Sequence, residues 1–127
     1  GKSSVIGDIL TGDARIHKLS FTGSTEVGRT LMAQCAPTIK RLSLELGGNA
    51  PFIVFDDADL EKAADGLIAS KYRNAGQTCV CANRVYVQDT IKDKFLDIFI
   101  KKVAELKVGN GMEEGVNVGP LINEKAL

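Results

Sequence analysis

The order of apolar and polar residues predicts helices and strands that alternate along the first third of the chain. A short helix over residues 4–10 would place four apolar side chains on one face: Val5, Ile6, Ile9 and Leu10. Residues 18–22 alternate and predict a strand, and the helix that follows ends before Pro37. Residues 40–46 predict a second strand. Because a single helix joins these strands, we expect them to be parallel.

The rest of the chain repeats this alternation with longer helices. Residues 51–55 form a continuous apolar run, which predicts a buried strand. The carboxylates that follow it suit the N-terminus of a helix, and capping explains them better than a metal cluster. That helix would bury one stripe of side chains: Leu60, Ala63, Ala64, Leu67, Ile68 and Tyr72. A strand over residues 84–88 precedes a last helix, which we expect to start with a capping box at Thr90.

The composition favours a globular α/β protein. The chain has 127 residues, 44% of them hydrophobic, and its 16 basic and 16 acidic residues cancel. No charge excess indicates nucleic acid and no apolar run suits a membrane, so we expect neither as a partner. The character of the chain changes at Gly47-Gly48. We therefore expect two parts, residues 1–47 and residues 48–127.

Cysteine and histidine usage narrows the possible chemistry. Three cysteines in 127 residues do not make a disulfide scaffold, which favours a reducing cytoplasm. There is no C-x-x-C pair and only one histidine, so we expect no metal site. The lone His17 lies just before a predicted strand and is expected at the surface. A catalytic base is therefore better sought among the carboxylates.

Two residues occupy positions that suit a catalytic role. Cys79 follows a predicted helix and the flexible Gly76, where backbone N–H groups could stabilise an oxyanion. Glu45 ends a predicted parallel strand, the edge at which open α/β sheets hold their sites. The simpler interpretations are a buried thiol and a solvated carboxylate. The residues alone leave both pairs of interpretations open.

Three motifs together resemble the aldehyde dehydrogenase superfamily. They are Phe21-Thr22-Gly23-Ser24-Thr25-Glu26-Val27-Gly28, Leu44-Glu45-Leu46-Gly47-Gly48-Asn49-Ala50-Pro51 and Gly76-Gln77-Thr78-Cys79. The stretch from Lys71 to Arg84 is most similar to succinate-semialdehyde dehydrogenases. The resemblance implies a three-layer α/β fold, with residues 1–47 ending a Rossmann-like NAD(P)-binding domain and residues 48–127 beginning the catalytic domain. It also implies a longer enzyme, of which this chain is a middle segment, and a homodimer or homotetramer.

The resemblance assigns a role to each motif. Cys79 would attack the aldehyde carbon of the substrate, and Glu45 would activate the water that hydrolyses the resulting thioester. The cofactor, NAD or NADP, would contact five residues at the strand ends: Gly23, Ser24, Glu45, Leu46 and Gly47. Arg73 would clamp the carboxylate of succinic semialdehyde. The alternatives are a helix-terminal arginine, a different semialdehyde or aldehyde as substrate, and a catalytically silent fragment.

Cys81 adds a possible redox function. In an extended strand, Cys79 and Cys81 would point to the same side with their α-carbons roughly 6.5–7 Å apart, at the limit for a disulfide. A tighter loop would bring them within range, and a reversible disulfide would then inactivate the nucleophile. The alternative is that Cys81 points into the core and never meets Cys79.

Overall fold

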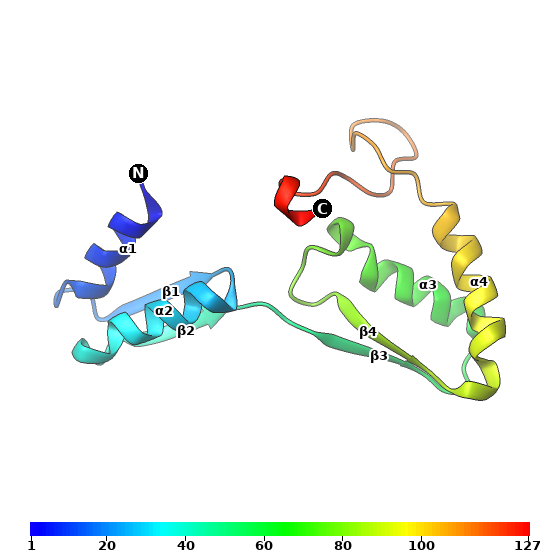
Figure 1. Cartoon of the computed structure of the whole chain (residues 1–127), viewed down its shortest axis with the longest axis horizontal. Coiled ribbons are helices and arrows are strands. Elements are labelled where there is room, and N and C mark those ends of the chain that lie inside the picture. The colour runs from blue at the N-terminus through cyan, green and yellow to red at the C-terminus, as the bar shows by residue number, and fades with distance from the viewer. The chain divides into compact units, whose positions relative to one another are not determined.

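The computed structural model describes all 127 residues, which form two compact units, Gly1–Gly47 and Gly48–Leu127 (Figure 1). Each unit contains one sheet of two parallel strands together with two helices. No helix is both long enough and apolar enough to cross a membrane. The structure is therefore a mixed α/β arrangement in which each sheet is small and one helix joins its two strands.

The first unit is a strand–helix–strand arrangement preceded by a helix. Its elements are α1 (Ser3–Gly12), β1 (Lys18–Thr22), α2 (Thr25–Cys35) and β2 (Arg41–Glu45). The strands are parallel, and their register runs from Lys18 opposite Arg41 to Thr22 opposite Glu45. The expectation of parallel strands is confirmed. The parallel register brings the carboxyl ends of β1 and β2 to the same edge of the sheet.

The start of α2 is fixed by a side chain. Ser24 is its N-cap, and its hydroxyl accepts a hydrogen bond from the Val27 backbone N–H at 3.3 Å. One turn into the helix, Gly28 is buried. A Cβ at Gly28 would lie 2.5 Å from a methyl of Leu46, so the absent side chain lets the helix approach the residue after β2.

Helix α1 extends further than the sequence predicts. The sequence predicts a helix that ends at residue 10, but residues 11 and 12 form its last turn. The hydroxyl of Thr11 donates to the Gly7 carbonyl at 2.9 Å, and Thr11 lies 3.4 Å from Gln34 of α2. Thr11 is buried, whereas the predicted apolar face of the helix is exposed. A tertiary contact with α2 therefore accounts for the extra turn.

The second unit contains β3 (Ala50–Val54), α3 (Leu60–Lys71), β4 (Ala82–Val87) and α4 (Lys92–Ala104). Strands β3 and β4 are parallel, and both helices lie on the same side of their sheet (Figure 1). The core forms between the helices and this sheet face. Its buried side chains are Val54, Ala64, Leu67, Ala82 and Phe95.

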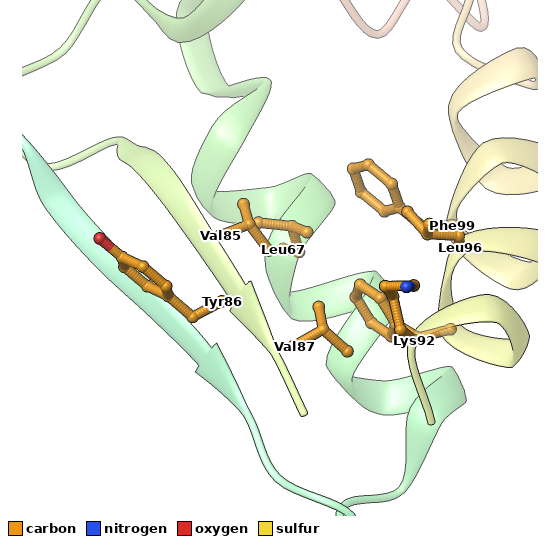
Figure 2. A pocket seen from close by; sticks show the side chains of 8 residues that line it. Leu67, Val85, Tyr86, Val87, Lys92, Leu96 and Phe99 are labelled. Carbon is orange, nitrogen blue, oxygen red and sulfur yellow. The ribbon is translucent and has the colours of Figure 1, made fainter. Parts of the chain in front are cut away.

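The prediction that residues 51–55 form a fully buried strand is wrong. Val54 is 2% exposed, but Ile53 on the opposite face is 56% exposed. The helices cover one face of the sheet, so alternate side chains of each strand stay open. Figure 2 shows Val85 and Val87 of β4 on the helix side near Leu67, around an open groove of about 440 Å³.

The two helices of this unit begin differently. Asp59 caps α3 by accepting the Lys62 backbone N–H at 3.2 Å, and this hydrogen bond, with a weaker one from the Lys62 side chain, lowers the pKa of Asp59. The capping box predicted at Thr90 is not formed. Asp89–Ile91 is a 3₁₀ turn that runs directly into α4, so Thr90 is inside a turn rather than at a cap position.

Candidate active site

The nucleophile candidate, Cys79, lies in an exposed turn between α3 and β4. A 3₁₀ turn, Arg73–Gly76, follows α3 and leads into this turn. Within the 3₁₀ turn Asn74, Ala75 and Gly76 have φ values of 51°, 56° and 80°. Glycine adopts this left-handed conformation without strain, asparagine tolerates it, and alanine rarely takes it. The backbone shortly before Cys79 is therefore in the left-handed conformation over three consecutive residues.

Gly48 supports the turn from the other side. A Cβ on Gly48 would overlap the backbone carbonyl oxygen of Cys79, so only glycine fits at this position. The Gly48 carbonyl accepts a hydrogen bond from the Asn83 side chain at 3.2 Å. The next carbonyl, that of Asn49, accepts from the Arg84 guanidinium at 3.0 and 3.2 Å. Strand β4 thus fixes the backbone on which the Cys79 turn rests.

Cys81 lies on the inside of the turn, not beside Cys79. Cys81 is 1% exposed, whereas Cys79 is exposed. The Cys81 sulfur lies 2.7 Å from the Thr78 hydroxyl and 3.7 Å from the Arg73 carbonyl. Of the two geometries considered, an extended strand and a tighter loop, the structure has the loop, because the Cys81 N–H donates to the Thr78 carbonyl and closes a turn. Strand alternation, which would have placed both thiols on one side, does not apply to a turn.

Arg73 stands two residues beyond the end of α3 and is exposed. Its backbone carbonyl accepts a hydrogen bond from the Cys81 thiol, and this bond connects Arg73 to the inner side of the Cys79 turn. The side chain is exposed, so an anion at the surface could meet it. This placement suits either a substrate carboxylate or the C-terminal end of the helix dipole.

The five candidate cofactor residues gather at one edge of the first unit. Glu45 is the last residue of β2 and is exposed, and its carbonyl accepts the Gly23 N–H at 3.0 Å. Ser24 follows Gly23 and caps α2. Leu46 packs against the buried start of the same helix, and a Cβ at Gly47 would lie 3.5 Å from the Thr25 hydroxyl. The structure thus brings this group together.

This edge fits part of a dinucleotide. The free N–H groups of a helix N-terminus and a nearby hydroxyl are the donors that a phosphate accepts. Helix α2 offers both at Ser24. A Cβ at Gly23 would come 2.5 Å from the ring of Phe21, so a larger residue at this position of the turn would clash with that ring. No three His, Cys, Asp or Glu side chains lie close enough together to hold a metal ion.

Comparison with known proteins shows the family of this chain. The model of the aldehyde dehydrogenase family matches residues 1–127. The chain belongs to the aldehyde dehydrogenase family. It is 63% identical to glutarate-semialdehyde dehydrogenase of Pseudomonas putida and 61% identical to the succinate-semialdehyde dehydrogenase (NADP(+)) GabD of Escherichia coli K12, in both cases over all 127 residues.

A solved aldehyde dehydrogenase shows the same fold. The crystal structure from Brucella melitensis biovar abortus 2308 matches 99% of this chain with a TM-score of 0.96 and 71% identity. The predicted fold class, an α/β segment of the aldehyde dehydrogenase fold, is thereby confirmed. The chain spans about a quarter of the length of these relatives, 26% in each case.

Sequence reasoning missed two residues that shape the Cys79 turn. Gly48 was treated only as part of a junction and a motif, and Gln77 only as part of a motif. Both contact partners far away in the sequence: Gly48 meets Cys79, and the Gln77 side chain bonds with Ile122. The sequence does show that Gly48 follows a first glycine and that Gln77 lies two residues before the thiol. Neither feature indicates which distant residue Gly48 or Gln77 contacts.

Proposed function

We propose that this chain carries the nucleophile and the general base of an NAD(P)+-dependent dehydrogenase for semialdehydes, with succinic semialdehyde as the first candidate substrate. The observation that carries the proposal is the exposed Cys79 thiol, presented by a turn that Gly48 and the buried Cys81 support. A nucleophile must reach its substrate and yet be held in one place, and this turn meets both needs. Residues 1–47 would then belong to the cofactor domain and residues 48–127 to the catalytic domain.

The chemistry assigned to the chain has two stages. The Cys79 thiolate attacks the aldehyde carbon and forms a thiohemiacetal, whose oxyanion the Cys79 backbone N–H can stabilise. NAD(P)+, when bound, supplies the acceptor for the two electrons and the hydrogen that leave this carbon. The thioester left on Cys79 is hydrolysed by a water that gives its proton to Glu45, which releases the acid and the free thiol.

The cofactor contacts are assigned to the edge of the first unit. Ser24 and the first N–H groups of α2 would hold a phosphate of the dinucleotide, and Gly23 would keep the approach open. Glu45, Leu46 and Gly47 would lie beside the nicotinamide. A relative named for NADP(+) supports NADP as well as NAD.

Arg73 is assigned to the substrate. Succinic and glutaric semialdehydes both carry a carboxylate at the end opposite the aldehyde, and relatives named for each are above 60% identical to this chain. A guanidinium can clamp such a carboxylate with two hydrogen bonds. Glutaric semialdehyde is therefore the second candidate substrate, and another aldehyde the third.

The remaining assignments concern the cell and the assembly. Three free cysteines suit a reducing compartment, and we place the protein in the cytoplasm. We propose that it functions within a homodimer or homotetramer of a longer chain.

Turnover tests the proposal directly. A full-length enzyme containing this segment should reduce NAD+ or NADP+ when succinic semialdehyde is added, and should do so more slowly with an uncharged aldehyde of similar length. The 127-residue chain alone should bind NAD(P)+ weakly and turn over no substrate. Absence of aldehyde-dependent reduction in the full-length protein would favour the competing function, a non-catalytic folding or interface module.

A further inference from the structure

Three consecutive left-handed residues lie just before Cys79, and their conformation needs external support. Asn74, Ala75 and Gly76 all have positive φ, and Ala75 has no intrinsic preference for it. Such a backbone persists only where surrounding contacts determine it. The contacts that hold this turn therefore also determine where the thiol is presented.

Gln77 supplies the local contacts. Its backbone N–H and its side-chain Nε2 both donate to the Asn74 carbonyl, each at 3.1 Å. In return, the Asn74 side-chain amide donates to the Gln77 carbonyl at 3.3 Å. These three hydrogen bonds join the two ends of the left-handed turn and hold it closed.

The same side chain reaches a segment more than forty residues away. Gln77 Oε1 accepts the Ile122 backbone N–H at 2.8 Å, and Nε2 donates to the Pro120 carbonyl at 3.4 Å. Both groups lie in the segment that follows the Val108–Val118 bridge. One amide, with its donor end toward carbonyls and its acceptor end toward an N–H, therefore ties residues 120–122 to the turn.

We propose that Gln77 is a positioning residue for Cys79, acting through this tether. The Val108–Val118 bridge holds the chain just before residues 120–122 on the second unit, and the Gln77 amide links these residues to the left-handed turn. Cys79 follows two residues later, with the buried Cys81 anchoring the other end of its turn. The importance of the tether for catalysis rests on the proposed role of Cys79 as nucleophile.

Two variants break the tether from opposite ends in the full-length enzyme. Gln77→Glu keeps the shape and the acceptor for Ile122 but turns an acceptor toward the Asn74 and Pro120 carbonyls. Ile122→Pro removes the N–H that Gln77 accepts while leaving Gln77 in place, and Ile122 is 81% exposed. Gln88→Glu is the matched control, because the Gln88 amide makes a similar pair of bonds to Asp56, at 2.9 and 3.0 Å, at the far end of β4.

Two readouts separate positioning from folding and from function. The first is the rate of Cys79 alkylation by iodoacetamide across pH, read by peptide mass spectrometry, which needs no turnover. The second is kcat, with the thermal midpoint measured alongside. We expect both tether variants to change the alkylation profile of Cys79 and to lower kcat roughly 10- to 100-fold. Gln88→Glu should change neither, even if it lowers the thermal midpoint as much.

Each outcome has one meaning. Altered alkylation with lower kcat supports the positioning role. Altered alkylation with unchanged kcat also supports it but contradicts the proposed function of Cys79. An alkylation profile equal to that of the parent in both tether variants would overturn the positioning role, whatever happens to kcat. If Gln77→Glu fails to fold, Ile122→Pro alone gives the same decision.

Discussion

The α-carbon of Gly48 lies directly against the backbone carbonyl of Cys79, with no space for a side chain between them. The Gly48 carbonyl is bonded to the Asn83 amide, and Asn83 Oδ1 in turn accepts from Lys71 Nζ at 3.3 Å. The backbone beneath the nucleophile is therefore fixed by the end of α3 and the start of β4. A change at Gly48 must move either this backbone or the Cys79 turn.

Gly48→Ala tests this relationship. The new methyl would overlap the Cys79 carbonyl, and overpacking of this kind costs about 1–3 kcal/mol of stability. We expect lower kcat together with a lower free energy of unfolding in urea. Gly66→Ala in α3 is the matched control, because a Cβ there has Phe52 at an ordinary 3.8 Å. It should leave kcat intact and stabilise the helix by about 0.5–1 kcal/mol. Equal kinetics in both variants would contradict the importance of the contact.

Cys79→Ala should abolish dehydrogenase turnover in the full-length enzyme, because the attacking sulfur is lost. Cys35→Ala should leave turnover nearly intact, because Cys35 is buried at the end of α2 and 1% exposed. Steady-state reduction of NAD(P)+ measures both. Substantial aldehyde oxidation by Cys79→Ala would remove the nucleophile assignment.

Glu45→Gln should slow thioester hydrolysis more than the oxidation step, because the amide cannot take a proton from water. A rapid-mixing experiment should then show a burst of NAD(P)H followed by slow turnover. The substitution keeps the size of an exposed side chain, so little loss of stability is expected. An unchanged steady-state rate would exclude Glu45 from the mechanism.

Arg73→Ala should raise KM for succinic semialdehyde much more than for an uncharged aldehyde of similar length. Loss of a charge-assisted bidentate contact costs about 1.5–3 kcal/mol, roughly 10- to 150-fold in affinity. Comparing succinic and glutaric semialdehydes in the same variant tests which chain length the arginine favours. Equal effects on charged and uncharged aldehydes would mean that Arg73 only supports the structure.

Cys81 remains a predicted redox partner of Cys79. Peroxide would oxidise the exposed Cys79 thiolate to a sulfenic acid, and the Cys81 thiol would then form the disulfide with release of water. Cys81 must first leave the Thr78 hydroxyl and the Arg73 carbonyl, so disulfide formation requires the turn to open. Inactivation by peroxide should be reversed by dithiothreitol in the parent and not in Cys81→Ala. Identical recovery in the two proteins would exclude the switch.

The alternation of apolar residues predicted the main helices and strands correctly because these elements depend on contacts close in the sequence. The parallel pairing of β1 with β2 followed from the single helix between them. Two predictions failed where distant contacts decide: Thr11 continues α1 because of α2, and Ile53 is exposed because helices cover one face of its sheet. The capping box at Thr90 failed for a local reason, because the Ile91 N–H donates to the Gln88 carbonyl and puts Thr90 inside a 3₁₀ turn.

The sequence by itself determined the family, the element order and the presence of a thiol and a carboxylate in recognisable motifs, since these reside in local residue order. Only the tertiary structure decided how the thiol is presented. The separation of an exposed Cys79 from a buried Cys81 depends on a turn, and that turn depends on Gly48 and on the Gln77 tether to Ile122. These contacts join residues 31 and 45 positions apart, and residue order alone cannot specify which distant backbone groups will meet.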